Sequence, residues 1–348
     1  MVVRLSRVKG LEGRRNDVLF SPCARRVQTP PALVFWGGDV QDYPEIMQAH
    51  RDNRNYIKWN LENTARILSQ NFPTYHIVVV RPSRIEYKSF SCYDNFVPSN
   101  NAGVPEHTPT HSALLHLHRL LQEVSNQVKK IPEEELLAGL EAAASEDPED
   151  FHTISPKEGS SNGAASPAPE TLEPSTSSLW WRPSLALQDS KLALVGFSKG
   201  CVVLNQLLYE FHYTHTLTPA DTQATRFISC ISWMYWLDGG HAGGRNTWLG
   251  SRCLLETLVR LNVEIFVHVS PYQVMDDARP WIGKEERAFT AMLRNLGANI
   301  HRYLHSDGTP VTLLTHFNVL SHFRGLQASA GAGAGAPHTD EDPDENTK

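Results

Sequence analysis

The feature that most constrains this chain is a serine held between an apolar strand and an apolar helix. The segment LALVGFSKGCVVLNQLLYEF places Ser198 in a G-x-S-x-G motif, with Gly196 before it and Gly200 after it. In a nucleophile elbow such a turn raises the serine above a sheet, and glycines allow strand and helix to approach closely. The alternative is a plain turn in which Ser198 is a helix N-cap. The flanking strand and helix favour the elbow.

The rest of the chain alternates strand-like and helical patterns, as expected for a mostly parallel sheet flanked by helices. Apolar runs predict buried strands over residues 32–36, 75–80, 192–196, 228–237, 263–269 and 299–304. Helical periodicity predicts helices over residues 61–71, 112–128, 201–212, 251–261 and 284–296. We therefore predict an α/β fold of the α/β-hydrolase type.

Composition shifts divide the chain into one domain and three irregular segments. Residues 31–326 are assigned to a single α/β-hydrolase-like domain. Within it, residues 131–178 turn acidic and then rich in Ser, Pro and Ala, which predicts a disordered insertion before the nucleophile strand. Residues 1–30 are basic and are interpreted as a disordered or transit segment. Residues 327–348 are predicted to be a disordered tail.

Composition also excludes several classes of function. The chain has 348 residues, 41% of them hydrophobic, and its formal net charge of −6 lacks the basic footprint of a nucleic-acid-binding protein. No apolar run approaches the ~18 residues of a spanning helix, so we predict no transmembrane segment. The five cysteines form no C-x-x-C pair, which favours a reducing compartment. His212 and His215 share a helix face without a carboxylate or cysteine nearby, and we predict no metal site and no cofactor.

A glycine-rich turn after the first predicted strand offers a candidate oxyanion hole. The segment ALVFWGGDVQDY carries Gly38 and Asp39 there, where this architecture supplies one backbone N–H to the oxyanion. The second donor is expected to be the N–H of Lys199, the residue after the serine. Asp39 brings a carboxylate close to developing negative charge, so its side chain has to point away. The alternative is an ordinary turn in which Asp39 caps a short helix.

The order serine, acid, histidine along the chain selects candidates for the acid and the base. His316 follows the last predicted strand and opens the short apolar helix HFNVLSHF, so we predict that it is the base. Two strands run into carboxylates, and both are candidates for the acid. Asp276 is the first choice because it follows the penultimate strand, and Asp238 is the alternative. The acid would hold the imidazole in one tautomer and stabilise its cation.

Longer strings add a resemblance to a family. FSCYDNFVPSN, GFSKGCVVLNQLLYEF, MYWLDGGHAGG, NTWLG, VSPYQV and WIGKE resemble the vertebrate mitochondrial family named for chromosome 2 open reading frame 69, from about Val34 to Phe323 outside the insertion. The resemblance implies an α/β-hydrolase-like fold, a mitochondrial location and a link to maintaining respiratory function. It carries Ser198 over as the elbow serine. A basic tail on a cytoplasmic protein is the alternative interpretation of the N-terminus.

The leading hypothesis is a serine hydrolase that cleaves a small-molecule acyl ester or thioester. In it, His316 deprotonates Ser198, and the N–H groups of Asp39 and Lys199 hold the oxyanion. One rival is a catalytically silent hydrolase fold that serves as a mitochondrial binding or assembly factor. A second rival is a lipid-surface protein without turnover, which an exposed apolar lid would indicate. The substrate and any protein partner stay open at this point.

Overall fold

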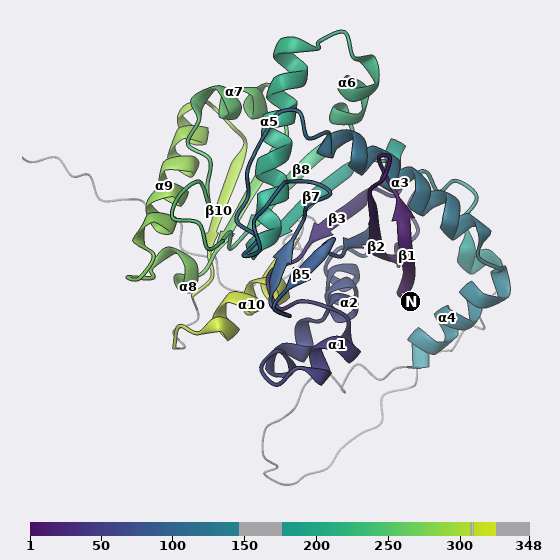
Figure 1. The fold of residues 1–348 in the computed structure, drawn as a ribbon. Coiled ribbons are helices and arrows are strands. Elements are labelled where there is room, and N and C mark those ends of the chain that lie inside the picture. Colours follow the sequence, from purple (N-terminus) through teal and green to yellow (C-terminus); the bar gives the residue numbers. More distant parts are fainter. Residues whose placement is uncertain (146–175, 307, 309, 325–348) are drawn as a thin grey trace, which may run out of the picture.

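An eight-stranded, mostly parallel sheet forms the centre of the molecule (Figure 1). The computed structural model describes residues 1–145, 176–306, 308 and 310–324. In spatial order the strands are β1 (Val3–Lys9), β2 (Arg15–Ser21), β4 (His76–Val80), β3 (Ala32–Trp36), β7 (Leu192–Phe197), β8 (Ile231–Leu237), β9 (Glu264–Val269) and β10 (Ile300–Leu304). Only β2 runs against the others, because it pairs antiparallel with both β1 and β4. This order, with its antiparallel second strand, is that of the α/β-hydrolase fold.

The central strands are apolar along their whole length because both faces of the sheet are covered. Every residue of β3, β4 and β7 is buried. Successive side chains enter opposite cores: Val34 and Trp36 belong to one hydrophobic cluster, and Leu33 and Phe35 belong to the other. Burial on both faces therefore explains the continuous apolar runs from which these three strands were predicted.

Helices cover the two faces of the sheet. The core on one face takes residues from α2 (Leu61–Asn71) and α10 (Leu313–His322). The core on the other face takes residues from α3 (Ala113–Lys130), α5 (Cys201–Leu217), α7 (Arg252–Arg260) and α9 (Pro280–Asn295). Shorter elements are α1 (Pro44–Ala49), η1 (Asn53–Trp59), α4 (Glu133–Ser145), α6 (Thr222–Ser229), α8 (Pro271–Val274) and the hairpin β5–β6 (Arg84–Glu86 and Phe90–Cys92). In the part of the chain that the structure describes, no helix is long and apolar enough to cross a membrane.

The six predicted strands and five predicted helices are all present, with ends that shift by a few residues. The largest shifts are in the helices, because α5 ends at Leu217 and not at residue 212, and α9 begins at Pro280 and not at residue 284. Among the strands the largest shift is at β8, which begins at Ile231 and not at residue 228. Ile228 and Ser229 instead form the end of α6, whose first turn is capped by the Asp221 side chain, which accepts from the Ala224 N–H. An apolar run that crosses from a helix into a strand carries no mark of the boundary, which explains the difference.

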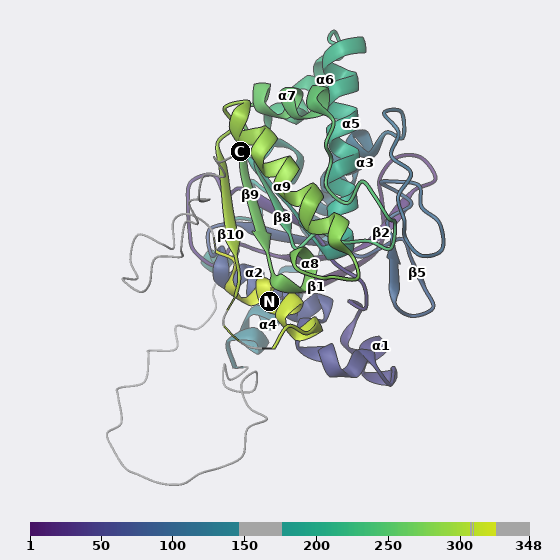
Figure 2. The same cartoon turned by 90° about the vertical axis from the view of Figure 1, so that its left-hand side faces the viewer.

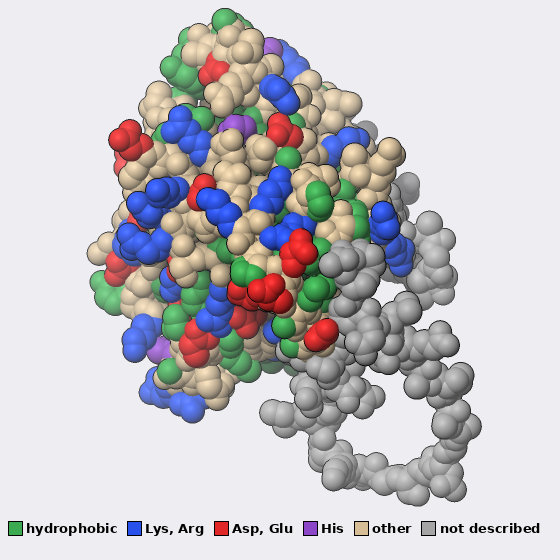
Figure 3. Space-filling model, turned by 90° about the vertical axis from the view of Figure 1, so that its right-hand side faces the viewer, with side chains coloured by type: hydrophobic (Ala, Val, Ile, Leu, Met, Phe, Trp, Pro, Cys, Tyr) green, Lys and Arg blue, Asp and Glu red, His purple; other side chains and the backbone are tan. Residues whose placement is uncertain are grey.

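The prediction that residues 1–30 are disordered is wrong for the described structure, and the alternative of a transit segment stays a prediction. β1 and β2 are strands of the main sheet, with Leu5 and Val8 buried. The basic side chains lie on the exposed side of this edge strand, and Arg4 pairs with Glu45 at 2.7 Å and with Glu62. The face on which β1 lies carries Lys and Arg side chains interspersed with acidic ones (Figure 3). Charged residues protect an exposed edge strand. The register of β1 shifts between Leu5 and Val8, so its two buried residues are three apart and the sequence shows no alternating pattern.

The predicted insertion, residues 131–178, is partly helical. Residues 133–145 form α4, and its Leu136 is buried in the main core. Residues 146–175 lie outside the described residues, as does the predicted tail at 327–348.

The carboxyl ends of the parallel strands meet at one edge of the sheet, and this edge carries the candidate site. α1, α8 and α10 follow β3, β9 and β10 respectively. Figures 1 and 2 both show these three helices at the same end of the molecule.

Candidate active site

Ser198 occupies a strained turn between β7 and α5. Its φ is 52°, in the left-handed region that costs a non-glycine residue about 1–2 kcal/mol. A Cβ on Gly200 would lie 2.0 Å from the carbonyl oxygen of Trp36, and one on Gly196 would lie 2.8 Å from Cys201 Cα. Only glycine fits at either position. The N-cap of α5 is Gly200, so Ser198 does not act as the helix cap.

His316 is held by a buried carboxylate. Its Nδ1 lies 2.7 Å from Asp238 Oδ2, and Asp238 is fully buried. The ring also stacks on Phe197, the residue before the serine, with centroids 4.6 Å apart. An imidazole whose Nδ1–H donates a hydrogen bond to a carboxylate presents Nε2 as the basic atom. The ring of His316 is therefore fixed beside the elbow in the tautomer that a general base needs.

The Asp238 carboxylate is itself held in place by Ser270, at the end of β9. Oδ1 accepts from the Ser270 N–H at 2.7 Å, and Oδ2 accepts from the Ser270 hydroxyl. Asp238 follows the last residue of β8 and has a φ of 48°, so the backbone leaves the extended conformation at this residue. Ser270 was not predicted, although its position directly after a predicted strand was the signal that marked the other candidates.

Asp276, the first choice for the acid, does not reach His316. Its Oδ2 lies 2.6 Å from Arg279 Nε, its Oδ1 accepts from the Ala278 N–H at 2.9 Å, and its side chain is partly exposed. The bond from Arg279 holds the pKa of Asp276 below its usual value. The physical reason is the short helix α8, which carries the chain away from the end of β9 before residue 276 is reached. The alternative, Asp238, is the carboxylate that the structure brings to the histidine.

Gly38 lies against the nucleophile, but its own N–H is already used. A Cβ on Gly38 would lie 2.8 Å from Ser198 Cβ. The Gly38 N–H donates to Gln41 Oε1 at 2.8 Å, and Gln41 in turn donates to the carbonyl of Trp59 at 2.7 Å. The N–H of Asp39 has no hydrogen-bond partner among the described residues. Of the two loop amides predicted from the sequence, that of Asp39 is therefore the one left for a ligand.

The side chains of Asp39 and Lys199 turn toward the β5–β6 segment. Asp39 Oδ1 accepts from the Ser91 N–H at 2.9 Å, and its Oδ2 lies 3.5 Å from Lys199 Nζ. Lys199 is 1% exposed and donates to the carbonyl of Ala102 at 2.7 Å. Burial raises the pKa of Asp39, and the Lys199 ammonium and the Ser91 N–H oppose that rise. Asp39 does not cap a helix, because the N-cap of α1 is Tyr43.

The structure gives little support at this edge for a cysteine nucleophile or for a metal centre. Cys201 is buried behind the elbow, its Sγ lies 3.1 Å from the carbonyl oxygen of Gly196, and burial raises the pKa of its thiol. A thiol is the nucleophile only as its thiolate, so Cys201 is suited to packing. No group of three or more His, Cys, Asp or Glu residues within the described ranges is arranged to hold a metal ion.

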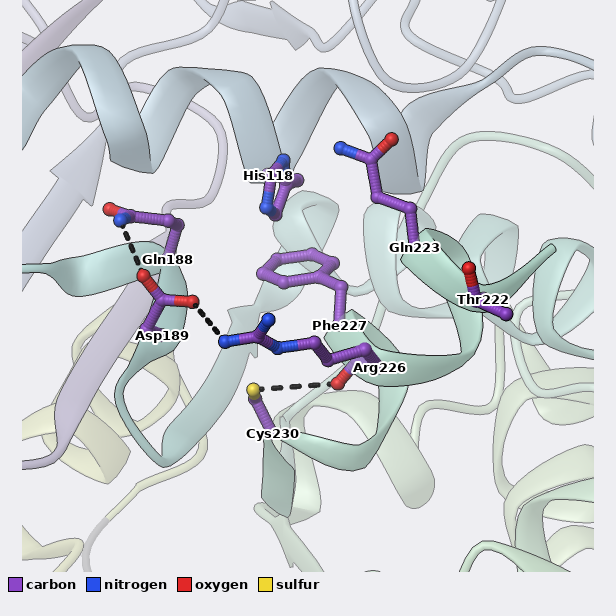
Figure 4. A pocket seen from close by; sticks show the side chains of 8 residues that line it. All are labelled: His118, Gln188, Asp189, Thr222, Gln223, Arg226, Phe227 and Cys230. Atoms are coloured by element: carbon purple, nitrogen blue, oxygen red, sulfur yellow. Dashed lines mark hydrogen bonds and ion pairs between the residues drawn. The ribbon is translucent and has the colours of Figure 1, made fainter.

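A surface pocket of about 470 Å³ lies at the opposite edge of the sheet (Figure 4). It is formed by α3, α6 and the segments that precede β7 and β8, and its polar side chains include His118, Gln188 and an Asp189–Arg226 pair 3.2 Å apart. Because these segments precede the strands, whereas Ser198 follows one, the pocket is separate from the candidate active site.

Comparison with known proteins finds relatives that match most of this chain. Residues 4–299 match the family model described as C2orf69. The mouse protein named mitochondrial protein C2orf69 homolog is 38% identical over 317 residues, which is 90% of this chain and 84% of the relative. The human mitochondrial protein C2orf69 is 37% identical over 313 residues, which is 89% of this chain and 79% of the human protein. Among solved structures, the carboxylesterase of Bacillus cereus covers 88% of this chain and 93% of its own, with a TM-score of 0.38 at 10% identity.

Proposed function

The chain belongs to the C2orf69 family, and from the geometry around its elbow serine we propose that it is a serine hydrolase acting on a carboxylic ester or thioester. The observation that carries the proposal is the 2.7 Å contact between His316 Nδ1 and the buried Asp238, beside a serine with positive φ. The three side chains follow β7, β8 and β10, so the fold alone brings them to one edge. Their roles are nucleophile, acid and base.

The reaction proceeds in two stages. His316 Nε2 takes the proton of Ser198 Oγ as the oxygen attacks the carbonyl carbon, and the resulting oxyanion is held by the N–H groups of Asp39 and Lys199. The imidazolium then protonates the leaving alcohol or thiol, which leaves an acyl-serine. Water attacks the acyl group, His316 takes its proton, and the carboxylic acid is released as Ser198 regains its hydrogen. Asp238 keeps the imidazole in the working tautomer throughout.

Two observations support turnover over the rival of a silent binding or assembly factor. A silent site is expected where side chains fill the oxyanion position or where the histidine lacks an acid. Here the side chains of Asp39 and Lys199 bond to Ser91 and Ala102, and His316 has its acid. One observation favours the rival: among the described residues, Ser198 Oγ makes no hydrogen bond to His316. Contacts of this kind often tighten only when substrate binds.

Both mammalian relatives carry the name of a mitochondrial protein, and we propose the same location for this chain. The link to respiratory function that the resemblance implies belongs to the same proposal. Its test is oxygen consumption in cells that lack the protein, complemented with either the natural chain or Ser198→Ala. Restoration by both chains would assign the respiratory role to binding rather than to catalysis.

The proposed activity is tested by labelling the purified chain with a fluorophosphonate, which reacts with activated serines. We expect the natural chain to be labelled and Ser198→Ala to remain unlabelled. The matched control is Ser251→Ala, at an exposed serine that is the N-cap of α7 and is not part of the elbow, and this variant should label like the natural chain. Absence of labelling in a chain that is folded by circular dichroism would favour the silent rival.

A further inference from the structure

Exposed hydrophobic side chains gather around the candidate active site. Of the six large hydrophobic residues that are exposed within the described part of the chain, Leu217 alone lies at the far end of α5. The other five, which we call the mouth rim, are Ile46, Tyr87, Met275, Val311 and Leu314. Each follows the carboxyl end of a parallel strand, β3, β4, β9 or β10, so all five belong to the edge that carries Ser198. Single exposed apolar residues are ordinary, but five at one edge indicate a contact surface.

The tip of the β5–β6 hairpin is the most exposed part of this rim. Tyr87 is 74% exposed, and it and Lys88 have φ values of 50° and 57°. Turns of this geometry normally take Gly, Asn or Asp, because larger side chains are strained there. An aromatic residue and a lysine that project from a strained turn into solvent are not explained by folding. Tyrosine and lysine are, however, the residues that settle at the boundary between lipid and water.

The hairpin tip is anchored to the loop that offers the oxyanion donor. The Val40 N–H donates to the carbonyl of Ser89 at 2.8 Å, and Asn53 Nδ2 donates to the carbonyl of Lys88 at 2.7 Å. Ser91 Oγ donates to the carbonyl of Gly38 at 2.8 Å. These bonds fix the hairpin tip relative to Gly38, which lies against Ser198, so a surface that binds the tip is held at a fixed position relative to the serine.

The charges next to the tip favour an anionic surface. In residues 51–59, which contain η1, and in the hairpin, the acids Asp52 and Glu86 are paired with Arg51 and Arg84 at 2.8 Å each. The remaining cations of these two segments are Arg54, Lys58 and Lys88, and none has a carboxylate partner among the described residues. Basic residues beside exposed apolar and aromatic ones are the combination that binds peripheral proteins to anionic bilayers.

We propose that the mouth rim docks on an anionic lipid bilayer, and that the ester cleaved at Ser198 belongs to a lipid carried by that bilayer. The substrate clause rests on the proposed hydrolase function, whereas the docking clause does not. Tyr87 and the aliphatic rim residues would enter the boundary region of the bilayer, and Arg54, Lys58 and Lys88 would face lipid phosphates. The carbonyl of a lipid ester would then need to move only from that boundary to the adjacent site edge.

The test is flotation of the full chain with vesicles, using Ser198→Ala so that no lipid is consumed. We expect binding to phosphatidylcholine vesicles that contain phosphatidylglycerol, weaker binding to phosphatidylcholine alone, and loss of binding as salt is raised. Tyr87→Ser should weaken binding about tenfold, and Lys88→Ser about fivefold. Leu217→Ser is the matched control, because it removes a similarly exposed apolar side chain at the opposite edge and should leave binding unchanged.

Three results would overturn the docking proposal: no binding to either vesicle, an equal loss of binding in Leu217→Ser, or a concentration-dependent dimer in sedimentation that Tyr87→Ser abolishes. Thermal unfolding of each variant checks that it is folded. Fluorophosphonate labelling of the natural chain in solution tests the hydrolase function separately. Vesicle binding without labelling would retain the docking clause and overturn the substrate clause. Labelling without vesicle binding would overturn both clauses and leave only the proposed hydrolase function.

Discussion

Replacing Asp238 by asparagine tests the acid with little change in shape. The carboxylate accepts from the Ser270 N–H through Oδ1, and from the Ser270 hydroxyl and His316 Nδ1 through Oδ2. The backbone N–H can only donate, so the amide oxygen of the Asp238→Asn variant should take the place of Oδ1. Its NH₂ group then faces His316 Nδ1, which must become an acceptor. The ring proton moves to Nε2, and the histidine can no longer accept the proton of Ser198.

The expected effect is a fall of about 10⁴-fold in the rate of serine labelling, as the wrong tautomer produces in catalytic triads. That factor corresponds to about 5 kcal/mol of barrier. The loss of charge-assisted hydrogen bonds to a fully buried group should also lower the free energy of unfolding by about 2 kcal/mol. The loss of rate is therefore much larger than the loss of stability, and the two can be separated.

The assay is the second-order rate of fluorophosphonate labelling, measured beside urea unfolding of the same samples. Asp276→Asn is the matched control: its partner is Arg279 on the surface, so labelling should stay within about twofold of the natural chain. Labelling that survives in a folded Asp238→Asn variant but is lost in Asp276→Asn would refute the assignment of the acid.

Three further outcomes are expected. Gly200→Ala should cost about 3 kcal/mol or more of unfolding free energy in urea, since its Cβ would lie 2.0 Å from the Trp36 carbonyl, and a cost below about 1 kcal/mol would contradict the elbow packing. Lys199→Met leaves Asp39 without its cation, so labelling should slow about tenfold while the unfolding free energy changes by less than in Gly200→Ala; an unchanged labelling rate would show that the pair does not position the oxyanion loop. Burial lowers the pKa of His76 to about 4, so the unfolded chain binds a proton at this residue first as pH falls through about 6.5. His76 by itself should contribute about 2 kcal/mol to the loss of stability between pH 7 and pH 5. Burial lowers the pKa of His107 and His241 to about 4 as well, which adds to the total loss, so the test is that His76→Gln reduces the loss by about 2 kcal/mol.

Sequence analysis identified the elements whose signal is local. The apolar runs of β3, β4 and β7 and the helical period of α2 follow from burial on a two-sided sheet, which marks each residue where it stands. The strands at the edge were missed for the opposite reason. In β1 only Leu5 and Val8 are buried, and the charged residues between them read as a basic tail.

The candidate acid shows where a local signal is not enough. Asp238 and Asp276 both follow buried strands, and chain order favoured Asp276. The choice depends on a positive φ at Asp238 and on the turn of helix that separates Asp276 from β9. Likewise, nothing in the sequence near Gly38 indicates that Gln41 takes its N–H. Gln41 is only three residues from Gly38, but its side chain is held by a bond to the carbonyl of Trp59, 18 residues further along the chain.

The sequence by itself determined that the chain would build a parallel sheet with Ser198 on an elbow at its carboxyl edge, because glycine spacing and apolar periodicity act over a few residues. Only the tertiary structure decided that Asp238 contacts His316, that the N-terminal strands extend the sheet at one side, and that the exposed hydrophobic residues lie at the edge of the site. These outcomes join residues far apart in the chain: Asp238 and His316 are 78 positions apart, and only packing of the whole sheet brings their side chains within 2.7 Å.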